Sequence, residues 1–115
     1  MTSDLFRLPS EYQALRESVR ALAEKEIAPH AHAVDEDHRF PQEASDALIK
    51  ANLHAAHVPA EFGGEGADAL AVVLIIEEVA RACASSSLIP AVNKLGSLPL
   101  IIGGDTEQKK RWLPE

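Results

Sequence analysis

The sequence predicts an all-α protein of about five helices. In the first segment, apolar residues recur three and four positions apart, at Tyr12, Leu15, Val19 and Leu22. Proline and glycine separate the helical segments, and residues that favour helix N-termini precede several of them. No segment shows the pattern of a strand ladder. Residues 1–115 are therefore predicted to form one helical domain.

The first helix is predicted over residues 10–28. The apolar stripe continues to Ile27, and Pro29 then breaks or kinks the helix because it has no backbone N–H. Ser10 is predicted as the N-cap, with Gln13 completing a capping box. The polar residues after Pro29 are expected to add one short turn.

The second and third helices flank a loop rich in glycine. The second helix is predicted to open at Pro41 and to run to about Asn52. Asp68 is predicted to cap the third helix, whose helical pattern continues through Cys83. Residues 69–76 are apolar on all sides, and such a helix must be covered on most sides.

The fourth helix is predicted from Leu88 to Ile102, after a break at Ser85–Ser87, and the glycines at 103–104 end it. Asp105 then caps a short last helix, with Gln108 at the capping-box position. Together the third and fourth helices carry more apolar surface than a small bundle buries. The chain is therefore expected either to oligomerise or to be one part of a larger protein.

Composition and charge exclude several classes of protein. The net charge of −7 argues against a general nucleic-acid binder and against binding at an anionic membrane surface. Cys83 is the single cysteine, so no internal disulfide forms and a reducing compartment is indicated. The first residues lack the pattern of a secretory signal, and no apolar run is long enough to span a bilayer. We expect a soluble, cytoplasmic protein.

The three glycines at Gly63, Gly64 and Gly66 raise the question of phosphate binding. Their spacing is neither that of a dinucleotide-binding fingerprint nor that of a Walker loop, and no strand is predicted before them. The favoured interpretation is that they supply unusual backbone angles between two helices. Phosphate binding is the weaker alternative.

The remaining polar residues form no complete active site. The histidines occur without any Glu-x-x-His pair, so no metal site is predicted, and most are interpreted as surface residues: His30, His32, His38, His54 and His57. Glu77 and Glu78 are adjacent on a helix and point apart, so one is expected to face a polar partner and the other solvent. Cys83 is predicted to be a buried structural thiol. No catalytic or cofactor-binding residue is assigned.

The order of four segments resembles the N-terminal α-domain of the flavin-dependent acyl-CoA dehydrogenases over almost the whole chain. These segments are LRESVRALAEKEIAPHA, RFPQEASDALIKANL, VPAEFGGEGADALAVVLIIEEVARACASSSLIPAVNKLG and GDTEQKKRWLP. The resemblance implies an enzyme that removes hydrogens from the α and β carbons of an acyl-CoA thioester and passes a hydride to FAD. It also implies a homo-oligomer, the tetramer of the family.

The resemblance places the flavin and the catalytic base outside this sequence. In the family, FAD lies mainly between a β-domain, a C-terminal helical domain and a neighbouring subunit, and the base is a glutamate of the C-terminal domain. Residues 1–115 are therefore expected to bind no FAD tightly, to be inactive alone and to need the remaining domains as partners. Neither Glu77 nor Glu78 matches the base. The glycine loop is expected only to join two helices.

The resemblance assigns part of the fourth helix to the substrate. Leu88, Ala91, Val92 and Leu95 share one face by helical spacing, which by itself fits ordinary core equally well. The resemblance favours an acyl channel for at least Ala91 and Leu95. Two rival hypotheses are a non-catalytic helical module that completes a partner subunit and, less favoured, a metal-binding helical bundle.

Overall fold

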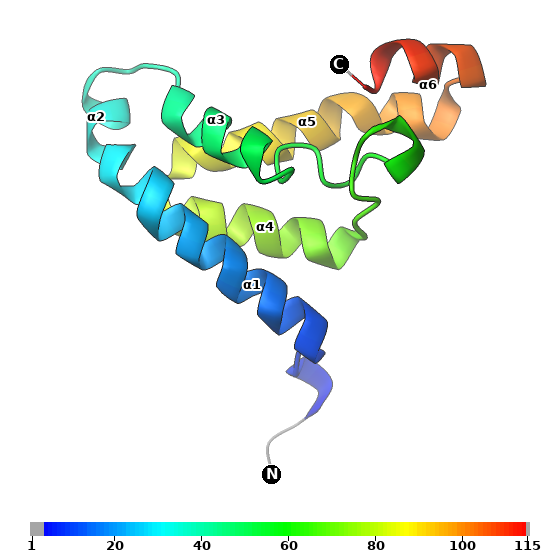
Figure 1. Ribbon diagram of the computed structural model, residues 1–115. Helices are drawn as coiled ribbons and strands as arrows, with labels where there is room; N and C mark the ends of the chain where they lie inside the picture. The colour runs from blue at the N-terminus through cyan, green and yellow to red at the C-terminus, as the bar shows by residue number, and fades with distance from the viewer. Residues whose placement is uncertain (1–3, 115) are drawn as a thin grey trace.

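The computed structural model describes residues 4–114, and all regular structure in that range is helical (Figure 1). The α-helices are α1 (Ser10–Leu22), α2 (Ala31–Glu36), α3 (Gln42–Lys50), α4 (Ala69–Ala82), α5 (Ala84–Gly103) and α6 (Thr106–Trp112). Short 3-10 turns occur at Asp4–Phe6, Ala28–His30 and Ala60–Phe62, and a π-helical turn at Ala23–Ile27. The all-α prediction is confirmed: α2 is the short turn expected after Pro29, and the other α-helices are the five predicted ones.

The central helix of the fold is α4. It packs against α1 on one side and against α5 on the other, and α6 follows at the far end of α5 (Figure 1). The core lies where α1, the π-helical turn, α3 and α4 meet, and its most buried side chains are Val19, Ile27, Leu48, Ile75 and Val79. Cys83 is buried at the end of α4, as predicted for a structural thiol.

The first helix ends earlier than predicted. α1 stops at Leu22, and the chain continues through the π-helical turn before Pro29. Because proline in a helix lacks the N–H donor and clashes with the preceding turn, the α-helical pattern cannot continue unchanged to this position. The amide of Ala28 donates instead to the carbonyl of Ala23, five residues back. Ala23 and Ile27 remain in the core on either side of this wider turn.

The predicted capping box at Ser10 is wrong. Pro9 is the N-cap of α1, in an extended conformation, and its carbonyl accepts hydrogen bonds from the amides of Tyr12 and Gln13. Among residues 4–114, no side chain caps this N-terminus. The Gln13 side chain donates to the carbonyl of Leu8 at 2.6 Å. Ser10 therefore lies inside the first turn instead of preceding it.

The predicted break at Ser85–Ser87 is also wrong. The interruption between α4 and α5 is the single extended residue Cys83, and α5 begins at Ala84, four residues before the predicted start. Ser86 and Ser87 are buried in its first turn. The Ser87 hydroxyl donates to the carbonyl of Ala84 at 2.6 Å, so the serine supports the helix locally where its propensity indicated a break.

The predicted caps of α4 and α6 are confirmed. The Asp68 carboxylate accepts from the amide of Ala71 at 2.9 Å, and it also accepts a hydrogen bond from the Tyr12 hydroxyl. Asp105 and Gln108 form the reciprocal capping box, at 2.8 and 2.9 Å. The predicted excess of apolar surface is present as well, on α4 and α5: Leu70, Val73, Leu88, Val92, Leu95, Leu98 and Ile102 are exposed. Within residues 4–114, no helix combines the length and apolar character needed to cross a membrane.

Candidate functional site

The candidate site begins with the four residues predicted to contact substrate, here called the α5 stripe: Leu88, Ala91, Val92 and Leu95. Three of them point outward from the described domain, with exposed fractions of 59% for Leu88, 54% for Val92 and 75% for Leu95. Ala91 is half-buried. The helical repeat places them on consecutive turns of one side of α5. Leu88, Val92 and Leu95 are therefore not core side chains of the described domain.

Two open grooves flank α5. The smaller, of about 440 Å³, lies between α3 and α5 and is lined by Leu88 among others. The larger, of about 730 Å³, lies between α5, the glycine loop and α6. Both grooves are lined by Ile49, His54, Val92 and Asn93. The structure thus places Leu88 and Val92 at the grooves, whereas neither groove includes Ala91 or Leu95 in its lining.

The glycine loop folds tightly on itself. Gly63 and Gly66 have φ values of +96° and +61°, as the turn interpretation predicts. Gly64 is required for a different reason: a Cβ atom there would lie 2.0 Å from the carbonyl oxygen of Val58. The amides of Gly63, Gly64 and Gly66 donate to the carbonyls of Ala60, Pro59 and Val58, at 3.1, 3.3 and 2.9 Å. These donors are therefore used within the loop.

Two side-chain contacts join the segment after α3 to α5. The Asn93 amide donates to the carbonyl of His54 at 3.0 Å. The Nε2 atom of His57 lies 2.5 Å from the Ser97 hydroxyl oxygen, and that hydroxyl donates to the carbonyl of Asn93 at 2.6 Å. Burial, and then the nearby Lys94 charge, lower the pKa of His57 below its usual value. The sequence offered no signal for these pairs, which lie 39 and 40 residues apart.

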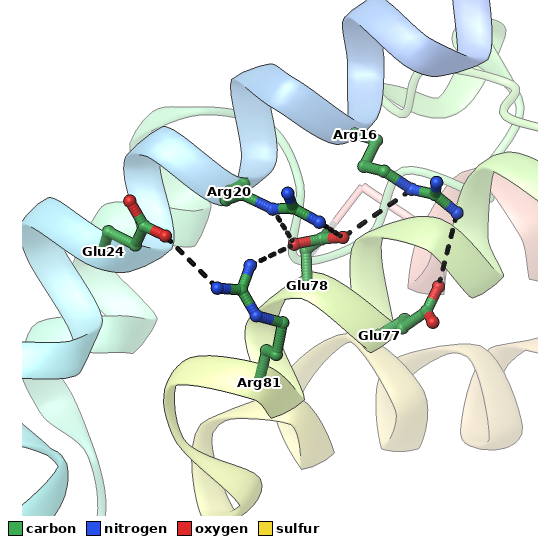
Figure 2. Close-up of polar contacts among 6 residues, drawn as sticks. All are labelled: Arg16, Arg20, Glu24, Glu77, Glu78 and Arg81. Atoms are coloured by element: carbon green, nitrogen blue, oxygen red, sulfur yellow. Dashed lines mark hydrogen bonds and ion pairs between the residues drawn. The ribbon is translucent and has the colours of Figure 1, made fainter.

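A cluster of charged residues joins α1 to α4 around Glu78, whose side chain is 2% exposed (Figure 2). Arg20 donates two hydrogen bonds to the Glu78 carboxylate, at 2.8 and 2.9 Å, and Arg81 donates one at 3.3 Å. The Nε atom of Arg16 lies 3.7 Å from the same carboxylate. These bonds, those from Arg20 above all, lower the pKa of Glu78 despite its burial. A carboxylate held in this way binds helices together and is poorly suited to accept a proton.

Glu77 differs from its neighbour, as predicted. Its side chain is 61% exposed, and it forms an ion pair with Arg16 at 3.9 Å. Adjacent positions on a helix point in different directions, which gives the two carboxylates different surroundings. In the described part of the chain, histidine, cysteine and acidic side chains form no group of three or more that could hold a metal ion.

Comparison with known families identifies the domain. Residues 9–115 match the family described as acyl-CoA dehydrogenase, N-terminal domain. The chain belongs to this family. The match covers nearly the whole chain.

Individual acyl-CoA dehydrogenases show how much of a whole enzyme the chain represents. A probable acyl-CoA dehydrogenase of Mycobacterium tuberculosis is 59% identical over 111 residues, which are 96% of this chain and 28% of that protein. The mitochondrial short-chain specific acyl-CoA dehydrogenase of Sus scrofa is 42% identical over 107 residues, 92% of this chain and 26% of that enzyme. The chain thus spans little more than a quarter of the length of these relatives.

Solved structures agree with this assignment. An acyl-CoA dehydrogenase from Bacillus anthracis, solved in complex with FAD, superimposes with a TM-score of 0.79 and 32% identity, over 94% of this chain and 19% of that one. A chain from a study of the electron transferring flavoprotein of Acidaminococcus fermentans superimposes with a TM-score of 0.86 and 27% identity, over 95% of this chain and 29% of that one.

The glycine loop of this acyl-CoA dehydrogenase domain does not fit a flavin pyrophosphate. A phosphate-binding loop presents free backbone N–H groups to the anion. Here the amides of the loop glycines bond to carbonyls of the same loop. In addition, the space beside Gly64 is filled by the Val58 carbonyl, a group that repels an anion. The loop serves the fold, and no flavin contact is assigned to it.

Proposed function

We propose that residues 1–115 form the N-terminal helical domain of an FAD-dependent acyl-CoA dehydrogenase, which carries out α,β-dehydrogenation of acyl-CoA thioesters. In this proposal the α5 stripe supplies one wall of the acyl channel. The observation that carries it is the outward exposure of Leu88, Val92 and Leu95, while the other side of α5 packs on α4 and the loop after α3.

The chemistry of the α5 stripe suits an acyl chain. Its side chains are aliphatic and contain no group that titrates, so they can bind and orient a hydrocarbon without taking part in proton transfer. Burial of each methylene contributes about 0.8 kcal/mol, so a wall of three or four such residues distinguishes chains by length. Neither Glu77 nor Glu78 is proposed as the base, because Glu78 is held by arginines and Glu77 points to solvent.

The Ala91→Phe variant of the full-length enzyme tests the acyl wall. The larger ring is expected to narrow the channel and to lower kcat/KM for long acyl chains about tenfold relative to short ones, equal to about 1.4 kcal/mol of transition-state binding. The measurement is kcat/KM across a series of acyl-CoA lengths. Ala21→Phe is a matched control at an exposed position of α1. An unchanged length profile in a folded Ala91→Phe enzyme would remove the α5 stripe from the channel.

We place FAD and the catalytic base in the remaining domains, which are also the proposed partners of the apolar surface on α4 and α5. The 115-residue chain is accordingly expected to bind no FAD, since its loop amides are already paired. Titration of FAD with the purified chain, followed by flavin fluorescence, is expected to show no saturable quenching. Saturable binding with a micromolar Kd would contradict this assignment.

The proposed assembly and location rest on the family and the sequence. A homo-oligomer of the tetrameric type is proposed because exposed apolar residues on α4 and α5 favour burial against further protein surface. A cytoplasmic location is proposed because the single cysteine is a free thiol.

A further inference from the structure

The middle turn of α5, residues 93–99, is intrinsically a weak helix. Pro99 has no amide to donate to the carbonyl of Leu95, so one helical hydrogen bond is missing there. Gly96 adds backbone freedom, and a Cβ at this position would contact nothing within 4 Å. The Ser97 hydroxyl bonds back to the carbonyl of Asn93, a contact that tends to bend helices. The sequence of this turn therefore contributes little to its stability as a helix.

The same turn is held from outside by the segment that follows α3. Asn93 donates to the carbonyl of His54, and His57 contacts the Ser97 hydroxyl. The direction of the second bond follows from counting protons. A serine hydroxyl has one hydrogen, which Ser97 donates to the carbonyl of Asn93. The Nε2 atom of His57 must therefore carry a hydrogen and donate it to the Ser97 oxygen.

We propose that His57, Asn93 and Ser97 form a latch that positions the middle turn of α5 against the loop after α3. Two of the latch residues, Asn93 and Ser97, lie on the same turns of α5 as Val92 and Leu95, which point outward. A shift of this turn therefore moves the α5 stripe with it. His57 is in this view a positioning residue, and its effect on an acyl chain rests on the proposed function.

The surroundings of the latch favour an uncharged histidine. His57 is half-buried, and the charge that acts on it is Lys94, the residue after Asn93 on α5. Burial and a like charge both disfavour the imidazolium form. The neutral ring with hydrogen on Nε2 still donates to Ser97. The latch thus forms without bringing a second positive charge beside Lys94.

Hydrogen exchange in the Ser97→Ala variant of the 115-residue chain tests the latch. Alanine favours the helix more than serine does, so helix propensity alone predicts slower exchange of the α5 amides. Loss of the latch predicts the opposite: exchange about fivefold faster for the amides within residues 97–102, where Pro99 has none, which is the change expected for one hydrogen bond. The readout is residue-resolved amide exchange by NMR. Exchange that is slower or unchanged in Ser97→Ala would overturn the proposal.

Two further variants separate the latch from general helix effects. Ser85→Ala is the matched control, because Ser85 is an exposed serine in the first turn of the same helix. It is expected to leave exchange in residues 97–102 unchanged. His57→Ala is expected to repeat the Ser97→Ala result, and His57→Gln, which keeps a donor at the end of the side chain, is expected to restore part of the protection. Equal exchange in His57→Ala and His57→Gln would assign the effect to packing and overturn the latch.

These exchange measurements need no substrate, so they test the latch independently of the acyl wall. Faster exchange in Ser97→Ala together with an unchanged length profile in Ala91→Phe would keep the latch and reject the wall. The reverse pair of results would reject the latch and keep the wall.

Discussion

A Gly64→Ala variant of the 115-residue chain is expected to lose about 3 kcal/mol of unfolding free energy or more. An added Cβ would lie 2.0 Å from the Val58 carbonyl oxygen and 2.6 Å from the Val58 Cβ atom, well inside contact distance. The obstructing atoms are backbone and the first side-chain atom, so no flexible side chain can move aside. Overpacking of this kind costs about 1–3 kcal/mol, and more where backbone must shift. The Val58 carbonyl would also lose its hydrogen bond from Gly66.

Gly96→Ala is the matched control for Gly64→Ala. The same methyl group is added, but nothing lies within 4 Å of it, and the position is inside α5. Alanine in a helix interior is favoured over glycine by about 1 kcal/mol, so this variant is expected to be more stable than the parent. Urea denaturation followed by circular dichroism measures both. Equal stability of the two variants would show that the glycine loop accommodates the added Cβ atom without a loss of stability, which would contradict the prediction.

Glu78→Gln is the second substitution with a large expected effect, a loss of about 2–3 kcal/mol of unfolding free energy. The carboxylate is almost fully buried and has three arginine partners. Removing one partner of a buried ion pair leaves the other charge uncompensated, which lowers the free energy of unfolding by about 3–5 kcal/mol. The loss expected for Glu78→Gln is smaller than this range because the side chain of Arg20 is 44% exposed and that of Arg81 is 54% exposed. Water can therefore solvate both arginines in the variant.

The control for Glu78→Gln is its neighbour. Glu77→Gln makes the same chemical change at an exposed position with one long ion pair, and it is expected to change stability by less than about 0.5 kcal/mol. Comparable losses in the two variants, measured by urea denaturation at neutral pH, would contradict the role assigned to Glu78.

The stabilisation of the fold by Glu78 also depends on pH, and the lowered pKa of Glu78 determines the direction of that dependence. A carboxyl group whose folded pKa lies below its unfolded value near 4.5 stabilises the fold above that value. The contribution is lost as the pH falls through the folded pKa. The difference in stability between the parent chain and Glu78→Gln is therefore expected to be full at pH 7 and to shrink below about pH 4.5. A difference that stays constant down to pH 3 would contradict this.

Local signals in the sequence predicted most of the helices, and they failed where two local rules competed. The caps at Asp68 and Asp105 are as predicted, because a cap depends on a side chain and an amide three residues away. Ser10 met the same rule and is not a cap, because the extended Pro9 before it already accepts the first amides. The helix propensity of the serines at 85–87 favoured a break, yet all three lie in α5, where Ser86 and Ser87 are buried against the rest of the fold.

The sequence by itself determined the helical class, the excess of apolar surface on α4 and α5, and the family of the chain. Those properties depend on spacing within one segment or on the order of segments. Only the tertiary structure decided which groups meet. Arg20 and Glu78 are 58 residues apart, and His57 and Ser97 are 40 apart. The reason is that helical periodicity shows which side of a helix is buried, whereas the partner across an interface depends on how whole helices and loops pack together.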